Sequence, residues 1–257
     1  MTTTALEPPV VARAFDYAPG EHIVPHAHAG GQFDYATTGI MTVTTDEGTW
    51  LVPPSRALWI PPRTTHEARH TGAVAMRTVY IAPELCRTLS PRCTVVSVTP
   101  LLRALILAAI DLGDAYVSGG AASRLVEVLL DQIRAADSMP VFLPLPSEEP
   151  LRSMLADFVA TPADQRTVGS CASALGMSAR TFSRMFLRET GMTFGAWRQQ
   201  LRLMEGMRLL ASGASVTDAA TRSGYNSTSA FIAMFRKAMG APPSQYFRRE
   251  SANGAYT

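Results

Sequence analysis

Two histidines and a glutamine are the first residues of this sequence whose types and spacing could do chemistry. His26 and His28 lie two residues apart in HAHAGGQFDYATTG, residues 26–39, and Gln32 follows after two glycines. Because alternate residues of a β-strand point to the same face, His26 and His28 would project side by side. Imidazoles bind transition metals, hydrogen-bond organic ligands or fill cores. The pair alone leaves a metal site, a ligand site and a packed core as open interpretations.

The elements that must position these side chains are short strands. Residues 11–82 contain β-rich runs separated by Gly and Pro pairs. The runs are IMTVTT (40–45), TWLV (49–52), ALWI (57–60) and MRTVYI (76–81). Regularly spaced short strands with such turn signals predict a barrel or a sandwich.

The period of the apolar residues changes between residues 99 and 136. In TPLLRALILAAIDLG and SRLVEVLLDQIRAA they recur at i, i+3, i+4 and i+7, which predicts two amphipathic helices. Thr99 is expected to cap the first helix, with Pro100 in its first turn, and the second helix is expected to be capped near Ser123. These helices either pack on the barrel or form a dimer seam.

A proline-rich segment follows the two helices. Residues 137–150, DSMPVFLPLPSEEP, cannot form a helix and are predicted to be a linker. A helical region then begins between Ser147 and Leu151 and continues to the end of the sequence.

The composition excludes several classes of protein. The 257 residues, 47% hydrophobic and 17% charged, suit one large or two modest folded domains. The longest apolar stretch, residues 101–112, is too short and interrupted to span a bilayer. No signal peptide is recognised at the N-terminus, so we expect a cytoplasmic protein. The three cysteines include no CxxC motif, and Cys86 and Cys93 are either a redox pair or, in the simpler interpretation, small buried hydrophobes.

Charge is distributed unevenly along the chain. Residues 1–150 hold 10 Lys/Arg and 15 Asp/Glu, whereas residues 151–257 hold 13 Lys/Arg and 6 Asp/Glu. A basic C-terminal part suggests a polyanionic partner such as DNA, although chance variation of a solvated surface would give a similar count.

The basic part contains an internal repeat. TFSRMFLRETGMTFGAW (181–197) and AFIAMFRKAMGAPPSQY (230–246) align with an offset of 49 residues. Each copy has a Phe pair at i and i+4 and a later glycine that would end the helix, and each follows a small-residue helix and a turn. The turn glycine and the capping serine are Gly176 and Ser178 in the first copy and Gly224 and Ser227 in the second. The pattern predicts two helix-turn-helix units, joined by a long helix over residues 194–213.

With this repeat, residues 151–249 resemble the DNA-binding domain of the AraC/XylS family of transcription regulators. The resemblance rests on GMSARTFSRMFLRETGM, on Arg202, Leu209 and Leu210 in the connector, and on VTDAATRSGYNSTSAFIAMFRKAMGAPPSQYFR. It implies that the second helix of each unit enters the DNA major groove. A helical domain that binds protein is the alternative.

The resemblance also implies which residues contact DNA. In the first unit they are Arg180, Ser183 and Arg184, and in the second Thr228, Ser229, Ile232, Arg236 and Lys237. Arg184 can read guanine, and Arg180 contacts either a base or a phosphate. The family often has a polar or basic residue where Ala233 stands, so we expect the second unit mainly to contact phosphates, through its helix N-terminus and Arg236 or Lys237.

The opening stretch resembles the first motif of the cupin barrel, a domain that regulators of this family often carry as their sensor. The spacing Gly-x5-His-x-His-x3-Gln-x6-Gly runs from Gly20 to Gly39, with Gln32 where Glu is usual. PPRTTHEARH, residues 61–70, resembles the second motif, although Arg63 stands where glycine is usual.

The cupin resemblance implies a ligand set. The metal ligands would be His26, His28, Gln32 and His66, and the ion would be zinc, nickel or iron. This ligand set is neutral, so we hypothesise that the ion recruits an anion, either hydroxide or the carboxylate of an effector. The alternative is a metal-free barrel whose His and Gln residues hydrogen-bond an organic ligand. We interpret His22 and His70 as surface or strand-end residues.

Together these features predict an α+β multidomain protein. Its expected parts are a cupin-like sensor barrel (1–98), two helices for packing or dimerisation (99–136), a linker (137–150), a double helix-turn-helix domain (151–249) and a tail (250–257). The predicted function is sequence-specific transcription regulation, modulated by a small molecule or metal ion, by a protein that is a homodimer and not an enzyme. The alternative is a dioxygenase-like cupin metalloenzyme with an accessory DNA-binding domain.

Overall fold

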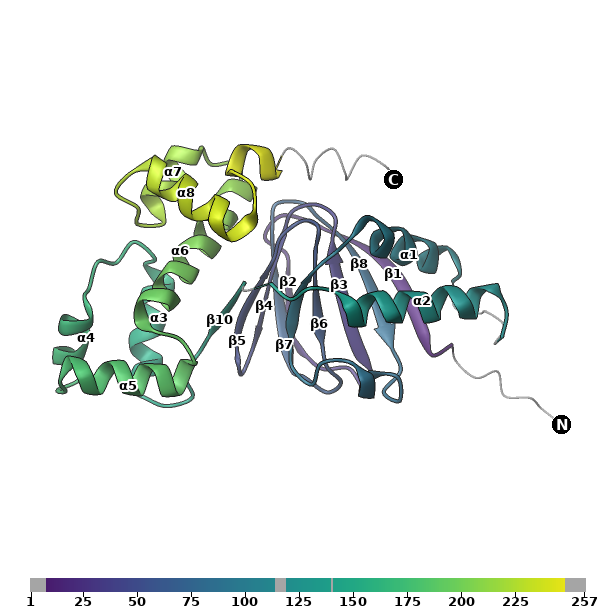
Figure 1. Ribbon diagram of the computed structural model, residues 1–257, viewed down its shortest axis with the longest axis horizontal. Helices are drawn as coiled ribbons and strands as arrows, with labels where there is room; N and C mark the ends of the chain where they lie inside the picture. The colour runs from purple at the N-terminus through teal and green to yellow at the C-terminus, as the bar shows by residue number, and fades with distance from the viewer. Residues whose placement is uncertain (1–7, 114–118, 140, 248–257) are drawn as a thin grey trace. The chain divides into compact units, whose positions relative to one another are not determined.

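The chain folds into two compact units. The computed structural model describes residues 8–113, 119–139 and 141–247, so the predicted tail at 250–257 lies outside the described residues. One unit comprises Met1–Met41 and Val52–Pro140, and the other comprises Thr42–Leu51 and Val141–Thr257 (Figure 1). No helix within the described ranges is long and apolar enough to cross a membrane.

The strands of the described residues form two five-stranded sheets. The first has the order β1 (Val10–Tyr17), β8 (Val74–Ile81), β3 (Gly31–Ala36), β6 (Arg56–Ile60) and β9 (Thr94–Ser97). The second has the order β10 (Phe142–Pro144), β5 (Gly48–Val52), β4 (Ile40–Thr45), β7 (His66–Thr71) and β2 (His22–His26). The prediction of short strands in a barrel is confirmed, and the predicted run at residues 40–45 coincides with β4.

Strand β3 is buried on both faces, and this positions the candidate site. Phe33 and Tyr35 join the hydrophobic core that the first sheet shares with two helices. Gln32 and Asp34 point to the opposite face and line a cavity. The alternation of the strand therefore separates core residues from site residues.

The two helices lie side by side along the first sheet (Figure 1). They are α1 (Pro100–Asp111) and α2 (Ala121–Ala135), and a short 3-10 helix, η1 (Cys86–Thr88), precedes them. Thr99 caps α1 as predicted, because its hydroxyl accepts from the Leu102 amide at 3.1 Å. Helix α2 is capped three residues before Ser123, at Gly120, and Ser123 lies in the first turn, where its hydroxyl accepts from the Gly119 amide.

The proline-rich segment forms no helix, as predicted, but part of it is a strand. β10 pairs antiparallel with β5, and backbone hydrogen bonds from Leu51 to Val141 and from Leu145 to Glu47, both 3.1 Å, extend the pairing. The Trp197 indole donates to the Pro144 carbonyl at 2.9 Å and is completely buried. The segment was predicted to be a linker because its prolines exclude a helix, but residues 142–144 form an edge strand, a position where proline is tolerated.

The second unit contains the predicted helix-turn-helix repeat. Its helices are α3 (Leu151–Ala160), α4 (Val168–Ala174), α5 (Ala179–Thr190), α6 (Phe194–Ala211), α7 (Val216–Arg222) and α8 (Thr228–Met239). Ser178 and Ser227 cap α5 and α8, and Gly191 and Gly240 end these helices in the left-handed conformation, with φ of 70° and 78°. The phenylalanine pairs of both copies, Phe182, Phe186, Phe231 and Phe235, are 0% exposed.

The burial of these rings predicts their contribution to stability. We expect Phe186→Ala to lower the free energy of unfolding of the second unit by about 3–5 kcal/mol, because it removes a fully buried aromatic side chain and leaves a cavity. The matched change at the next position, Leu187→Ala, should cost less than about 0.5 kcal/mol, because Leu187 is 50% exposed. Urea unfolding of the full chain, followed by helical circular dichroism, measures both. Equal effects of the two substitutions would contradict the burial pattern.

Candidate functional site

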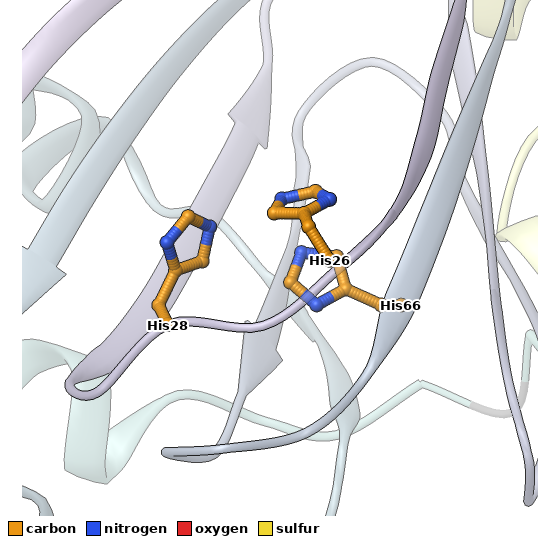
Figure 2. A group of neighbouring side chains, drawn as sticks. All are labelled: His26, His28 and His66. Atoms are coloured by element: carbon orange, nitrogen blue, oxygen red, sulfur yellow. The ribbon is translucent and has the colours of Figure 1, made fainter.

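Three imidazoles converge on one point of the first unit. His26 ends β2, His28 follows it, and His66 begins β7 directly opposite His26 in the strand register. One ring nitrogen from each lies within 4.8 Å of the others. Figure 2 shows the three rings facing one another from two segments of backbone. His26 and His66 lie 40 positions apart in the sequence, and the pairing of β2 with β7 brings them together.

Backbone carbonyls fix the ring tautomers. The Nδ1 atom of His26 lies 2.9 Å from the Val24 carbonyl, and that of His66 lies 2.9 Å from the Thr64 carbonyl. A carbonyl only accepts, so each Nδ1 donates, and in the neutral ring the lone pair resides on Nε2. The Nε2 atoms of His28 and His66 are buried and have no hydrogen-bond partner among the described residues. Such oriented lone pairs suit metal ligands.

Burial also keeps two of these rings neutral. It lowers the pKa of His66, against a smaller opposing effect of the hydrogen bond to the Thr64 carbonyl. Burial lowers the pKa of His28 as well, and the neighbouring His26 adds to this effect. Both rings are therefore unprotonated near neutral pH, which is the form that binds metal.

Gln32 adds an oxygen to the same site. Its side-chain nitrogen donates to both carboxylate oxygens of Asp34, at 3.0 and 2.9 Å, and the Thr78 hydroxyl donates to Asp34 at 2.7 Å. The Gln32 Oε1 atom is buried without a partner among the described residues. Burial raises the pKa of Asp34 to about 6, although the Thr78 and Gln32 hydrogen bonds oppose this rise. The donor set of three imidazoles and one amide oxygen fits a transition-metal ion.

A cavity of about 170 Å³ adjoins the histidines. A water molecule occupies about 30 Å³ in the liquid, so the cavity has room for a small organic molecule. The lining residues are Phe15, Tyr17, Ile23, His26, His28, Gln32, Asp34, Met41, His66, Ala68, Met76 and Tyr80. Burial raises the pKa of Tyr80 to about 12 and that of Tyr17 above its usual value, so both phenols stay protonated and can donate hydrogen bonds.

Sequence reasoning missed part of this site. Asp34, Tyr17 and Tyr80 were not predicted, although the period of two from Gln32 to Asp34 would have indicated Asp34. His70 lies near the end of β7, one of its two predicted places, but it is not a surface residue: it is 2% exposed, and its ring stacks on Tyr17 with centroids 4.0 Å apart. His70 shares the inward face of β7 with His66, four residues away. His22 is exposed as expected and lies 3.0 Å from Glu67.

Helix α5 presents its predicted DNA-contact residues to solvent. Arg180, Ser183 and Arg184 are exposed, on the face opposite Phe182 and Phe186. Neither arginine forms an ion pair within the described residues, whereas the Ser183 hydroxyl donates to the Ala179 carbonyl at 2.9 Å. The two guanidinium groups are therefore available to an external partner. Thr181 and Arg188, which sequence reasoning did not select, line a shallow groove beside Arg184.

Helix α8 presents fewer polar groups at its beginning. Ser229 is exposed, whereas Thr228 and Ile232 are only partly exposed. Arg236 and Lys237 are exposed but lie in the last turn. The basic groups of α8 are thus near its C-terminal end, whereas those of α5 begin in its first turn.

Both parts of the chain match known families. Residues 8–138 match the family described as AraC-like ligand binding domain, and residues 171–249 match a helix-turn-helix domain family. The HTH-type transcriptional regulator NimR of Escherichia coli K12 is 33% identical over 224 residues, which cover 87% of this chain and 82% of NimR. RipA of Corynebacterium glutamicum, also an HTH-type transcriptional regulator, is 37% identical over 103 residues, which cover 40% of this chain and 31% of RipA.

A solved structure is similar to the helix-turn-helix part. It is the DNA-binding domain of AdpA, a global transcriptional factor, in complex with a target DNA. Its sequence is 31% identical, it is covered completely by 43% of this chain, and the TM-score is 0.40.

NimR and RipA are both transcriptional regulators, and neither supports the cupin metalloenzyme alternative. The match to the ligand-binding family covers more than half of the chain, and the match to NimR spans both units. The chain therefore belongs to the AraC family of transcriptional regulators, with an AraC-like ligand-binding domain followed by a helix-turn-helix DNA-binding domain.

Proposed function

We propose that this regulator senses its effector at a divalent metal ion held by His26, His28, Gln32 and His66. The observation that carries the proposal is that three imidazoles converge on a cavity that also holds the unpartnered Gln32 side-chain oxygen. Zinc, nickel and iron suit this mixture of imidazole nitrogen and amide oxygen. The ion would supply positive charge that holds an anion, either hydroxide or the carboxylate of an effector.

The chain's own residues would select the effector. The apolar side chains of Phe15, Ile23 and Met76 provide one wall of the cavity, and the phenols of Tyr17 and Tyr80 provide hydrogen-bond donors. A volume of about 170 Å³ excludes large ligands. The effector class that fits is a small anion with a compact apolar body.

We further propose that α5 provides the sequence-specific contacts to DNA. Arg184 and Arg180 would contact bases or phosphates, with Ser183 beside them, because all three are exposed on one face. In α8, Thr228, Ser229 and Ile232 would approach the groove, and Arg236 and Lys237 would contact phosphates. A target on the chromosome implies that the protein works in the cytoplasm.

We also propose that the regulator is a homodimer whose protomers pair through the outer face of α2. Val128 is 44% exposed on this face, with Arg124 and Asp131 exposed on either side of it. In an antiparallel pairing about a two-fold axis, Arg124 of each protomer would approach Asp131 of the other. Two protomers would then bind paired half-sites.

The proposed metal site predicts that substitution of a ligand removes the bound metal. Protein purified without a tag or chelator should contain about one zinc, nickel or iron ion per chain, and His66→Ala should lose most of it, because a ligand is removed. His22→Ala is the matched control, since His22 is exposed and pairs with Glu67 outside the site. Elemental mass spectrometry measures the content. Equal metal in both variants, or none in the wild type after incubation with these ions, would contradict the metal site.

The DNA proposal predicts which arginine carries specificity. Arg184→Ala should weaken operator binding by about 1–3 kcal/mol and reduce the preference over unrelated DNA, because a bidentate base contact is lost. Arg152→Ala removes the same charge from an exposed position on α3 and should leave the preference unchanged. Binding isotherms at several salt concentrations, on operator fragments selected from random DNA, measure both. The assignment fails if the two variants lose the same affinity on every sequence.

The dimer proposal predicts that one charge on α2 separates the protomers. Val128→Glu should weaken self-association at least about tenfold, since it places like charges at the centre of the interface. Sedimentation velocity over a concentration series measures the association. The reversed pair Arg124→Asp/Asp131→Arg should keep the dimer, and a monomeric wild type would rule the interface out.

A further inference from the structure

We propose that Asp34 is the positioning residue of the metal site, and that it supplies through Gln32 the negative charge that a ligating carboxylate would otherwise bring. This inference rests on the metal site proposed above. It concerns a residue that does not itself reach the ion and that no sequence motif selected.

The hydrogen bonds around Asp34 determine how the Gln32 amide is oriented. Both carboxylate oxygens lie within 3.0 Å of the same amide nitrogen. A carboxylate accepts and does not donate, so the NH₂ end of the amide must face Asp34 and the carbonyl end must face away. The carbonyl oxygen, Oε1, is then left buried and unpartnered beside the histidines. Asp34 therefore selects the one amide orientation that offers an oxygen to a cation.

Asp34 is itself held in place by the sheet. Thr78 is its direct register partner on β8, and the Thr78 hydroxyl donates to it at 2.7 Å. Thr78 is 0% exposed and Asp34 2% exposed, so water does not compete for these bonds. The carboxylate has no Lys or Arg ion-pair partner among the described residues. A buried carboxylate without a cation is unfavourable, and a metal ion a few ångströms away would compensate its charge.

The carboxylate of this site belongs to Asp34, the next residue after Gln32 on the same face of β3. A glutamate at position 32 would place the charge directly on the ion. Here an amide stands at that position and the charge lies two residues further, joined to it by two short hydrogen bonds. The site consequently retains one negative charge against the two positive charges of the ion, and one positive charge remains for an effector of charge −1.

Exchanging the carboxylate of Asp34 and the amide of Gln32 tests the inference. Zinc affinity of the full chain is measured by competition with a chromophoric chelator, beside unfolding curves for each variant. Asp34→Asn should weaken zinc binding about 10- to 100-fold, the usual effect of losing a partner of a metal ligand. Thr78→Val removes a neutral hydrogen bond to the same carboxylate and should have a clearly smaller effect.

The decisive variant combines the substitutions. Gln32→Glu alone would place two carboxylates side by side, whereas Gln32→Glu/Asp34→Asn puts the charge on the ion and an amide next to it. The double variant should bind zinc at least as tightly as the wild type, because Gln32→Glu restores the negative charge that Asp34→Asn removes. This comparison does not require the single Asp34→Asn variant to fold.

The remaining outcomes separate the two proposals. If Asp34→Asn weakens zinc binding equally in both backgrounds, Asp34 only supports the fold and the inference is wrong, while the metal site stands. If wild-type protein binds no zinc, nickel or iron, both the proposed metal site and the inference are wrong.

Discussion

The candidate site depends on the burial of strand β3 on both faces. Phe33 and Tyr35 pack into the core shared with α1 and α2, while Gln32 and Asp34 point into the cavity. A strand whose apolar side chains are held this firmly cannot slip in register, because a slip of one residue would exchange core and cavity residues. The packing of the helix-covered face of the sheet therefore also fixes the positions of the β3 residues that line the cavity.

The electrostatics of the site follow from the same burial. Removal from water lowers the pKa of His28 and His66 and raises the pKa of Asp34 to about 6, and Asp34 has no Lys or Arg partner among the described residues. A low-dielectric cavity with free lone pairs and one negative charge favours a cation more than an aqueous surface would. Tyr17 and Tyr80 line the same cavity, so their phenols would face an anion bound to the proposed metal ion.

In the DNA-binding unit, aromatic packing determines which side chains remain outside. Phe182 and Phe186 fasten one face of α5 to the core, so Arg180 and Arg184 must lie on the other face. The same unit holds the proline-rich segment, because Trp197 of α6 donates to Pro144 of β10, and β10 pairs with β5. Residues 142–144 of the predicted linker are thus an edge strand.

The sequence by itself determined the local features of this protein. Short strands, capped helices, the glycine stops at Gly191 and Gly240 and the repeated Phe pairs all follow from residue periodicity and backbone preference, which act over a few positions. Only the tertiary structure decided the rest, because it depends on pairing between distant segments. The pairing of β2 with β7 brings His26 to His66, the register of β3 with β8 joins Asp34 to Thr78, and the inward face of β7 buries His70. Proline composition likewise predicted a linker around β10, whereas residues 142–144 form a strand because they pair with β5.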